Sequence, residues 1–232
     1  MRRMKYNWLL FDADGTLFDF DKVEAAALRS TFEALGAACD ERCAELYRQI
    51  DRQIWLDFEN GGISQERLRT RRFELLLDAI GLDGDPGEFS RRYLGFLACG
   101  TDLIDGAEEL LRSLYGRVGL LLITNGMADV QRPRFARSVV RRYFSDVVIS
   151  EEVGAGKPDP KIFDVAFARM GLPKKKEVLM VGDSLTADIK GGNDYGIDTC
   201  WFNPQGKPSS DGLVIHYEIG ALQELLPLLE GA

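Results

Sequence analysis

The feature that most constrains the fold is a set of short apolar runs alternating with segments of helical spacing. The runs lack the polar alternation of a half-exposed sheet, so they predict buried parallel strands. The predicted strands are Trp8–Phe11, Val118–Ile123 and Val178–Val181, with shorter ones at Val147–Ile149 and Thr199–Phe202. The segments with helical spacing are Ala107–Leu114, Ile162–Met170 and Leu185–Asn193. This alternation predicts an α/β fold, a Rossmann-like three-layer α/β/α core around a parallel sheet.

The interval from about Val23 to Leu97 breaks the alternation, because it contains no convincing strand. Four stretches in it have a helical pattern: "VEAAALRSTFEALG", "DERCAELYRQIDRQIWLDF", "SQERLRTRRFELLLDAIG" and "DPGEFSRRYLGFLA". We therefore expect an α-helical cap over residues 18–97, inserted after the first strand. The catalytic core would then consist of residues 1–17 and 98–232.

Polar residues follow each strong apolar run. They are Asp12 and Asp14 after the first run, Thr124 and Asn125 after the second, and Asp183 and Asp188 after the third, with Lys157 in the loop "GAGKPDP" before another predicted helix. Open α/β sheets bind ligands outside the carboxyl ends of their strands, so these side chains are expected to converge on one edge. Any one of them alone would be read as a turn, cap or surface residue.

Carboxylates brought to one crevice repel one another by a few kcal/mol for each close pair, at an effective dielectric of about 20. A cation must therefore lie among them, and hard oxygen ligands suit Mg²⁺, which also accepts phosphate oxygens. Lys157 adds a second positive charge, and the Thr124 hydroxyl adds a donor. With its repulsion from phosphate offset, Asp12 is suited to nucleophilic attack that forms an aspartyl-phosphate. Asp14 is suited to proton transfer as a general acid and base.

Composition argues against several other classes of protein. With 29 Lys and Arg against 37 Asp and Glu, the net charge of -8 does not favour binding to nucleic acid or to anionic membranes. Three basic clusters are interpreted as solvated faces: Arg69, Arg71 and Arg72; Arg132 through Arg142; and Lys174 to Lys176. Four scattered cysteines and a single histidine do not favour structural zinc or Cys-His catalysis. No run reaches membrane-spanning length, and we expect a cytoplasmic protein with reduced thiols.

The strand-end residues resemble the haloacid dehalogenase superfamily of phosphohydrolases. Its four motifs occur in order as "DADGT" (12–16), "ITNG" (123–126), "GKPDP" (156–160) and "GDSLTAD" (182–188). The resemblance implies that Asp12 is the nucleophile and a metal ligand, and that Asp14 is the acid and base and binds the metal through its carbonyl. It implies phosphate binding by Thr124, Asn125 and Lys157, metal binding by Asp183, and a helical cap of the C1 type. Asp188 would either bind the metal as well or lie next to its ligands.

Longer stretches, including "WLDFENGGIS" and "ISEEVGAGKPDPKIFD", resemble the pyrimidine 5′-nucleotidases of the YjjG type over nearly the full length. This resemblance implies hydrolysis of pyrimidine nucleoside monophosphates. The clustered carboxylates predict that the reaction needs Mg²⁺, for which Mn²⁺ can substitute. We expect a monomer or a homodimer, between which the sequence does not decide. Phe18, Phe58 and Asn60 are candidates for contacting the base. Tyr195 departs from the family pattern, where a small residue is usual, and is expected to affect helix packing.

Three other functions stay open. A phosphatase or phosphomutase acting on sugar phosphates or phosphoglycolate would use the same core residues. A haloacid dehalogenase would have no leaving alcohol to protonate, so Asp14 argues against it. A catalytically silent binding protein on the same fold is disfavoured by the complete set of motif residues.

Overall fold

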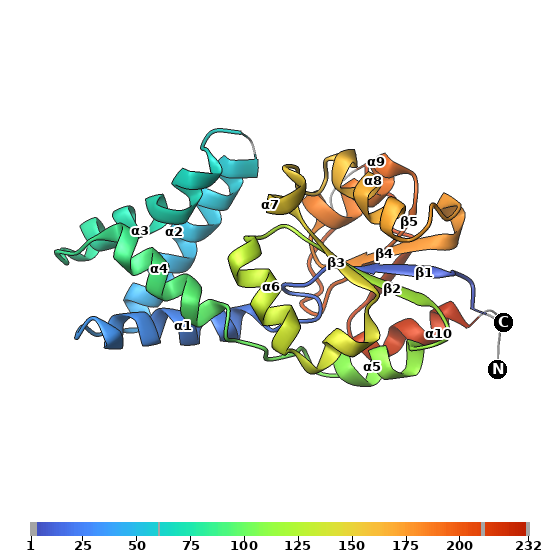
Figure 1. The fold of residues 1–232 in the computed structure, drawn as a ribbon, viewed down its shortest axis with the longest axis horizontal. Coiled ribbons are helices and arrows are strands. Elements are labelled where there is room, and N and C mark those ends of the chain that lie inside the picture. The colour runs from blue at the N-terminus through green and yellow to red at the C-terminus, as the bar shows by residue number, and fades with distance from the viewer. Residues whose placement is uncertain (1–3, 60, 210–211, 231–232) are drawn as a thin grey trace. The chain divides into compact units, whose positions relative to one another are not determined.

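The computed structural model describes residues 4–59, 61–209 and 212–230. The chain forms two compact units: Asp21–Gly100 makes up one, and the segments before and after it make up the other (Figure 1). We call them the helical unit and the sheet unit. The assignment of residues 1–17 and 98–232 as catalytic core, and of 18–97 as cap, remains a prediction about their roles.

The sheet unit contains a six-stranded parallel sheet, which confirms the predicted fold class. Its strands are β1 (Trp8–Phe11), β2 (Gly119–Thr124), β3 (Asp146–Ile149), β4 (Val178–Gly182), β5 (Asp198–Phe202) and β6 (Tyr217–Ile219), in the order β3-β2-β1-β4-β5-β6. The chain reverses its direction across the sheet at β1, the kind of switch point at which open α/β sheets bind ligands. The sequence pattern did not predict β6, a three-residue edge strand.

Helices cover both faces of this sheet (Figure 1). The helical elements of the sheet unit are α5 (Ala107–Leu114), α6 (Ala128–Arg137), η1 (Val139–Tyr143), α7 (Ser150–Val153), α8 (Pro160–Arg169), η2 (Lys175–Glu177), η3 (Leu185–Ile189), α9 (Lys190–Tyr195), η4 (Leu222–Glu224) and α10 (Leu225–Leu229). The predicted helix at Leu185–Asn193 is a π-helical turn, η3, that continues into α9.

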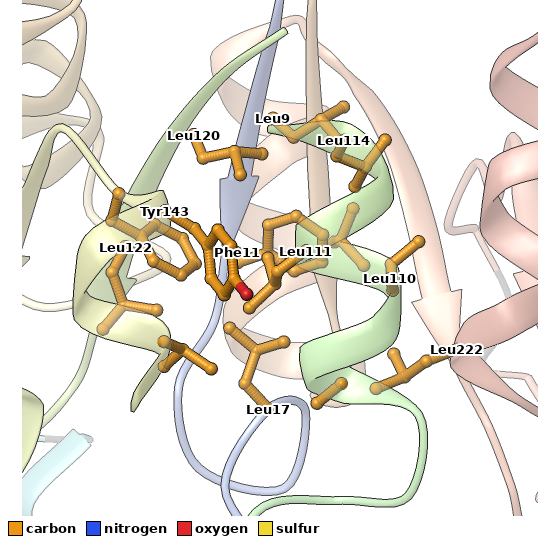
Figure 2. Close-up of a cluster of buried hydrophobic side chains, with 14 of the residues drawn as sticks. Leu9, Phe11, Leu17, Leu110, Leu111, Leu114, Leu120, Leu122, Tyr143 and Leu222 are labelled. Atoms are coloured by element: carbon orange, nitrogen blue, oxygen red, sulfur yellow. The ribbon is translucent and has the colours of Figure 1, made fainter. Parts of the chain in front are cut away.

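Alternate side chains of the strands point to opposite faces, so the sheet has two cores. On one face, Leu9 and Phe11 of β1 pack with leucines of α5 (Figure 2). On the other face, Leu10 packs with the cluster that includes Ile162 and Phe163 of α8. Because strands with both faces buried must be apolar throughout, the runs seen in the sequence identify them well.

The helical unit consists of four α-helices: α1 (Phe20–Ala34), which starts at the boundary residue, α2 (Glu41–Glu59), α3 (Gln65–Ile80) and α4 (Pro86–Leu97). The Ser64 side chain accepts a hydrogen bond from the Arg67 N–H at the start of α3, which ends at Gly81 in the left-handed conformation. An aromatic cluster from three helices forms its core, with Tyr47, Phe73, Phe89 and Tyr93 all buried. None of the helices in the described part of the chain has the length and apolar character needed to cross a membrane.

A buried polar group lies within this helical unit. Arg72 is 2% exposed and donates a hydrogen bond of 2.6 Å to Asp51, so its interpretation as part of a solvated face is wrong. The charge pattern did not reveal this, because the partner carboxylate comes from a different helix. Glu24 of α1 is also buried. Burial, with a smaller contribution from the Asp51 charge, raises the pKa of Glu24 to about 8.

Candidate active site

The candidate site lies at the carboxyl ends of the three central strands. In the sheet, Phe11 at the end of β1 pairs with Leu122 of β2 and with Val181 of β4. This register places Asp12, which follows β1, between the ends of its two neighbours. The residues that follow the apolar runs therefore meet at one edge, as expected from the sequence.

Lys157 lies at the centre of the site. Its side chain is 2% exposed, and its Nζ donates hydrogen bonds to Asp12 Oδ1 at 2.5 Å and to Asp188 Oδ1 at 2.7 Å. A third bond, of 3.0 Å, goes to the carbonyl oxygen of Ile123 in β2. Burial lowers the pKa of Lys157, but the charges of Asp12 and Asp188 outweigh this effect and raise it above its usual value. Lys157 is therefore a buried cation held between two carboxylates.

Asp188 is held in place by its second oxygen and by a close approach to the main chain. Its Oδ2 accepts a hydrogen bond of 3.0 Å from the Ser184 N–H, while Oδ1 faces Lys157. A Cβ at Gly182, the last residue of β4, would lie 2.2 Å from the Asp188 carboxyl carbon. Glycine at 182 is therefore required for the carboxylate to reach this position.

Three of the predicted metal ligands gather in one acidic group. Carboxylate oxygens of Asp12, Asp183 and Asp188 lie within 4.8 Å of one another. The Thr16 hydroxyl lies 3.3 Å from Asp12 Oδ2 and 3.4 Å from Asp183 Oδ1, and so spans two of them. These hard oxygen donors fit a divalent cation such as Mg²⁺.

The acidic group favours protons as well as cations. Burial raises the pKa of Asp12 well above its usual value; Lys157 opposes this shift, whereas Asp188 and Asp183 add to it. Partial burial and the Asp188 charge raise the pKa of Asp183 to about 7. A bound divalent cation would favour the ionised form of these carboxyl groups, because opposite charge stabilises a carboxylate.

Asn125 is bound to the loop that carries Lys157. Its amide donates a hydrogen bond of 2.8 Å to the Lys157 carbonyl oxygen and accepts one of 2.7 Å from the Lys157 N–H. The structure therefore places the Asn125 side chain where it positions Lys157. Thr124, at the end of β2, is 1% exposed.

The Asp14 carboxylate is bound to side chains of α6. It accepts hydrogen bonds from Gln131 and from Arg134, two residues that the sequence reading did not assign to the site. Arg134 is 0% exposed, so its interpretation as part of a solvated face is wrong. The available signal was the i, i+3 spacing of Gln131 and Arg134, which places both on one face of a helix that follows the motif "ITNG".

The three candidates for contacting the base have different environments. Phe18 is 1% exposed and belongs to the core of the sheet unit, with the Arg134 guanidinium 4.4 Å from its ring centre. It is therefore buried in the protein and not free to stack on a base. Phe58 of the helical unit is half-buried and makes an edge contact with Trp55, with ring centres 6.0 Å apart. Asn60 lies outside the described residues.

Comparison with known proteins gives a consistent family assignment. Residues 6–196 match the family described as haloacid dehalogenase-like hydrolase. The chain is 35% identical over 226 residues to the pyrimidine 5′-nucleotidase YjjG of Escherichia coli, and the alignment covers 97% of this chain and 99% of that protein. It is 37% identical over 228 residues to the pyrimidine 5′-nucleotidase PynA of Streptococcus pneumoniae, and this alignment covers 98% of this chain and 96% of that protein.

A solved structure supports the same assignment. The HAD-hydrolase YfnB of Bacillus subtilis, in its structure bound to magnesium, matches with a TM-score of 0.93 and 37% identity over 98% of this chain and 100% of that chain. These matches confirm the resemblance inferred from the four motifs and the prediction that the protein is a hydrolase. The chain belongs to the haloacid dehalogenase-like hydrolase family.

Proposed function

We propose that this hydrolase is a Mg²⁺-dependent phosphomonoesterase that forms an aspartyl-phosphate on Asp12. The observation that carries the proposal is the Asp12 carboxylate, held 2.5 Å from the buried Lys157 cation within an acidic group that fits a metal ion. The relative YfnB is described as bound to magnesium. Asp12, Asp183 and Asp188 would hold the ion, with the Asp14 main-chain carbonyl as a further ligand. Once bound, the ion would supply positive charge to offset the phosphate charge.

The chain's own residues account for both steps of the reaction. An oxygen of Asp12 attacks phosphorus, and the bond from phosphorus to the leaving oxygen breaks as Asp14 transfers a proton to that oxygen. In the second step Asp14 takes a proton from water, the water oxygen attacks phosphorus, and the bond to Asp12 breaks. Lys157 offers its positive charge and Thr124 its hydroxyl group to the phosphate oxygens, while Asn125 holds the Lys157 loop.

We propose pyrimidine nucleoside 5′-monophosphates as the preferred substrates. Two relatives at 35% and 37% identity, aligned over nearly their whole length, carry the name pyrimidine 5′-nucleotidase. The half-buried Phe58, with Trp55 beside it, offers an aromatic surface suited to a planar base. The residues of the sheet unit are expected to bind only the phosphoryl group. The helical unit is therefore expected to determine which leaving alcohol the enzyme prefers.

A phosphate-release screen tests the proposal. The panel should contain UMP, dUMP and dTMP, purine nucleoside monophosphates, ribose 5-phosphate, phosphoglycolate and p-nitrophenyl phosphate, each with Mg²⁺, Mn²⁺ or a chelator. We expect the highest kcat/KM for the pyrimidine nucleotides and loss of turnover on chelation. Higher kcat/KM for sugar phosphates or phosphoglycolate would contradict the nucleotidase proposal and leave the phosphatase proposal standing.

A matched pair of variants tests whether the helical unit determines the substrate preference. Phe58→Leu should lower kcat/KM for UMP far more than for ribose 5-phosphate, because the sugar phosphate has no aromatic ring to stack on Phe58. Phe96→Leu is the control, since Phe96 is another partly exposed aromatic of the same unit, on α4. Equal losses for the two substrates in Phe58→Leu would remove Phe58 from the specificity argument.

A further inference from the structure

The Asp14 carboxylate is held at both of its oxygens by side chains of one helix. Gln131 Nε2 donates a hydrogen bond of 2.6 Å to Oδ2, and Arg134 Nη1 donates one of 2.5 Å to Oδ1. Both donors lie on α6, which follows β2 and the "ITNG" segment. Gln131 and Arg134 lie three residues apart on this helix and therefore share a face.

The two donors are fixed by their surroundings. Gln131 is 4% exposed, and Arg134 is fully buried with its guanidinium over the Phe18 ring. A Cβ at Gly126 would lie 2.8 Å from Gln131 Nε2, so the glycine of the "ITNG" motif leaves room for this amide. Because these groups have little freedom to move, they fix the orientation of the carboxylate that they bind.

Asp14 itself remains accessible. Its side chain is 23% exposed, although Arg134 is fully buried. A carboxylate offers about four acceptor positions, and the two hydrogen bonds use only one on each oxygen. One face of Asp14 is therefore held by α6, and the other lone pairs stay available for a proton in transit.

We propose that Gln131 and Arg134 are positioning residues that orient Asp14 for proton transfer. This inference rests on the acid and base role proposed for Asp14. A displacement of about 1 Å in a reacting group can lower a rate about 10²-fold, so fixing both oxygens of Asp14 raises the rate of proton transfer. Neither side chain needs to touch the substrate for this effect.

Substrates that differ in their need for a proton give the sharpest test. A nucleoside leaves as an alcohol and needs a proton from Asp14, whereas p-nitrophenolate is a stable anion and leaves without one. The quantity to compare is kcat/KM, because it covers the step in which the leaving group departs. The substrates are p-nitrophenyl phosphate and UMP, or the best alkyl phosphomonoester of the screen.

The variants are Gln131→Met, Arg134→Met and Arg134→Lys, with Asp14→Asn as reference. We expect both Met variants to lower kcat/KM for the alkyl substrate by about 10- to 100-fold and for p-nitrophenyl phosphate by less than about 3-fold. Arg134→Lys should recover part of the loss, because it keeps a cationic donor. Arg117→Met is the matched control: it breaks a 2.7 Å ion pair with Glu230 at the amino end of β2 and should leave the ratio between substrates unchanged.

The outcomes separate this inference from the proposed function. If Asp14→Asn lowers kcat/KM equally for both substrates, the acid role of Asp14 fails. If Asp14→Asn is selective for the alkyl substrate but Gln131→Met is not, the positioning role fails while the proposed function stands. Loss of the buried Arg134 could also prevent folding, so Gln131→Met, with its unfolding temperature checked, decides the result.

Discussion

Replacing the buried lysine of the site should destabilise the protein strongly in the absence of metal. In Lys157→Met the carboxylates of Asp12 and Asp188 lose a cation at 2.5 and 2.7 Å. Each of these contacts corresponds to a Coulomb attraction of about 6–7 kcal/mol at an effective dielectric of about 20, before the penalty for burying the charges. Removing one partner of a buried pair typically costs about 3–5 kcal/mol, and we expect a loss of that size in the free energy of unfolding.

The assay is urea denaturation at about pH 8 with a chelator present. Lys190→Met is the control, because Lys190 is an exposed lysine paired with Asp194 one helical turn away. Removing this surface pair should cost less than about 1 kcal/mol. The loss in Lys157→Met should shrink as the pH falls toward 5, since the unpaired carboxylates then take up protons. Addition of Mg²⁺ should also recover stability, because an ion that binds only the folded state stabilises it.

Two results would refute this reasoning. One is a Lys157→Met protein as stable as Lys190→Met at pH 8 without metal. The other is a loss of stability that stays constant from pH 5 to pH 8, because a purely steric effect of the shorter side chain would not depend on the ionisation of its neighbours.

Three further outcomes are expected. The increase in unfolding temperature caused by Mg²⁺ should grow from pH 5 to pH 8, because the pKa of Asp183 is raised to about 7 and the ion binds the ionised carboxylate; an increase independent of pH would contradict this. The free energy of unfolding of Glu24→Gln, measured in urea, should rise relative to that of the parent by up to about 1.4 kcal/mol for each pH unit between about pH 4.5 and 8. The reason is that the raised pKa of Glu24 lets the folded parent keep a proton that its unfolded state loses. Parallel pH profiles of unfolding free energy for the two proteins would count against this. Gly182→Ala should lower both phosphate release and the free energy of unfolding, the latter by about 1–3 kcal/mol, because its Cβ collides with Asp188; parent-like values of both would show that the carboxylate can move without consequence.

The sequence predicted the central strands and most helices to within a few residues, because buried strands and amphipathic helices leave repeating apolar patterns. It did not predict α6, in which Pro133 interrupts a largely polar stretch, or the short edge strand β6. Tyr195 was expected to affect helix packing, and it stacks on Phe163 with ring centres 5.2 Å apart.

The positions of the strand-end residues were predictable, because parallel strands bring their carboxyl ends to one edge. The burial of Arg134 was not, since its partner Asp14 lies 120 residues away in the sequence. Clustered charged residues usually form a solvated face. Only the contacts in the folded structure identify a residue of the cluster that is buried. The same reason explains why Arg72 was misread.

The most direct test of the account is the identification of the phosphorylated residue during turnover. The enzyme, with Mg²⁺ and the best substrate of the screen, is quenched rapidly in acid, and the acyl phosphate is reduced with borohydride. Peptide mass spectrometry should then find homoserine at position 12 in place of Asp12, and the same treatment of Asp12→Asn, which should lack turnover, should give no reduced residue. Reduction at another carboxylate, or an Asp12→Asn enzyme that releases phosphate at the parent rate, would contradict the assignment of Asp12 as the nucleophile.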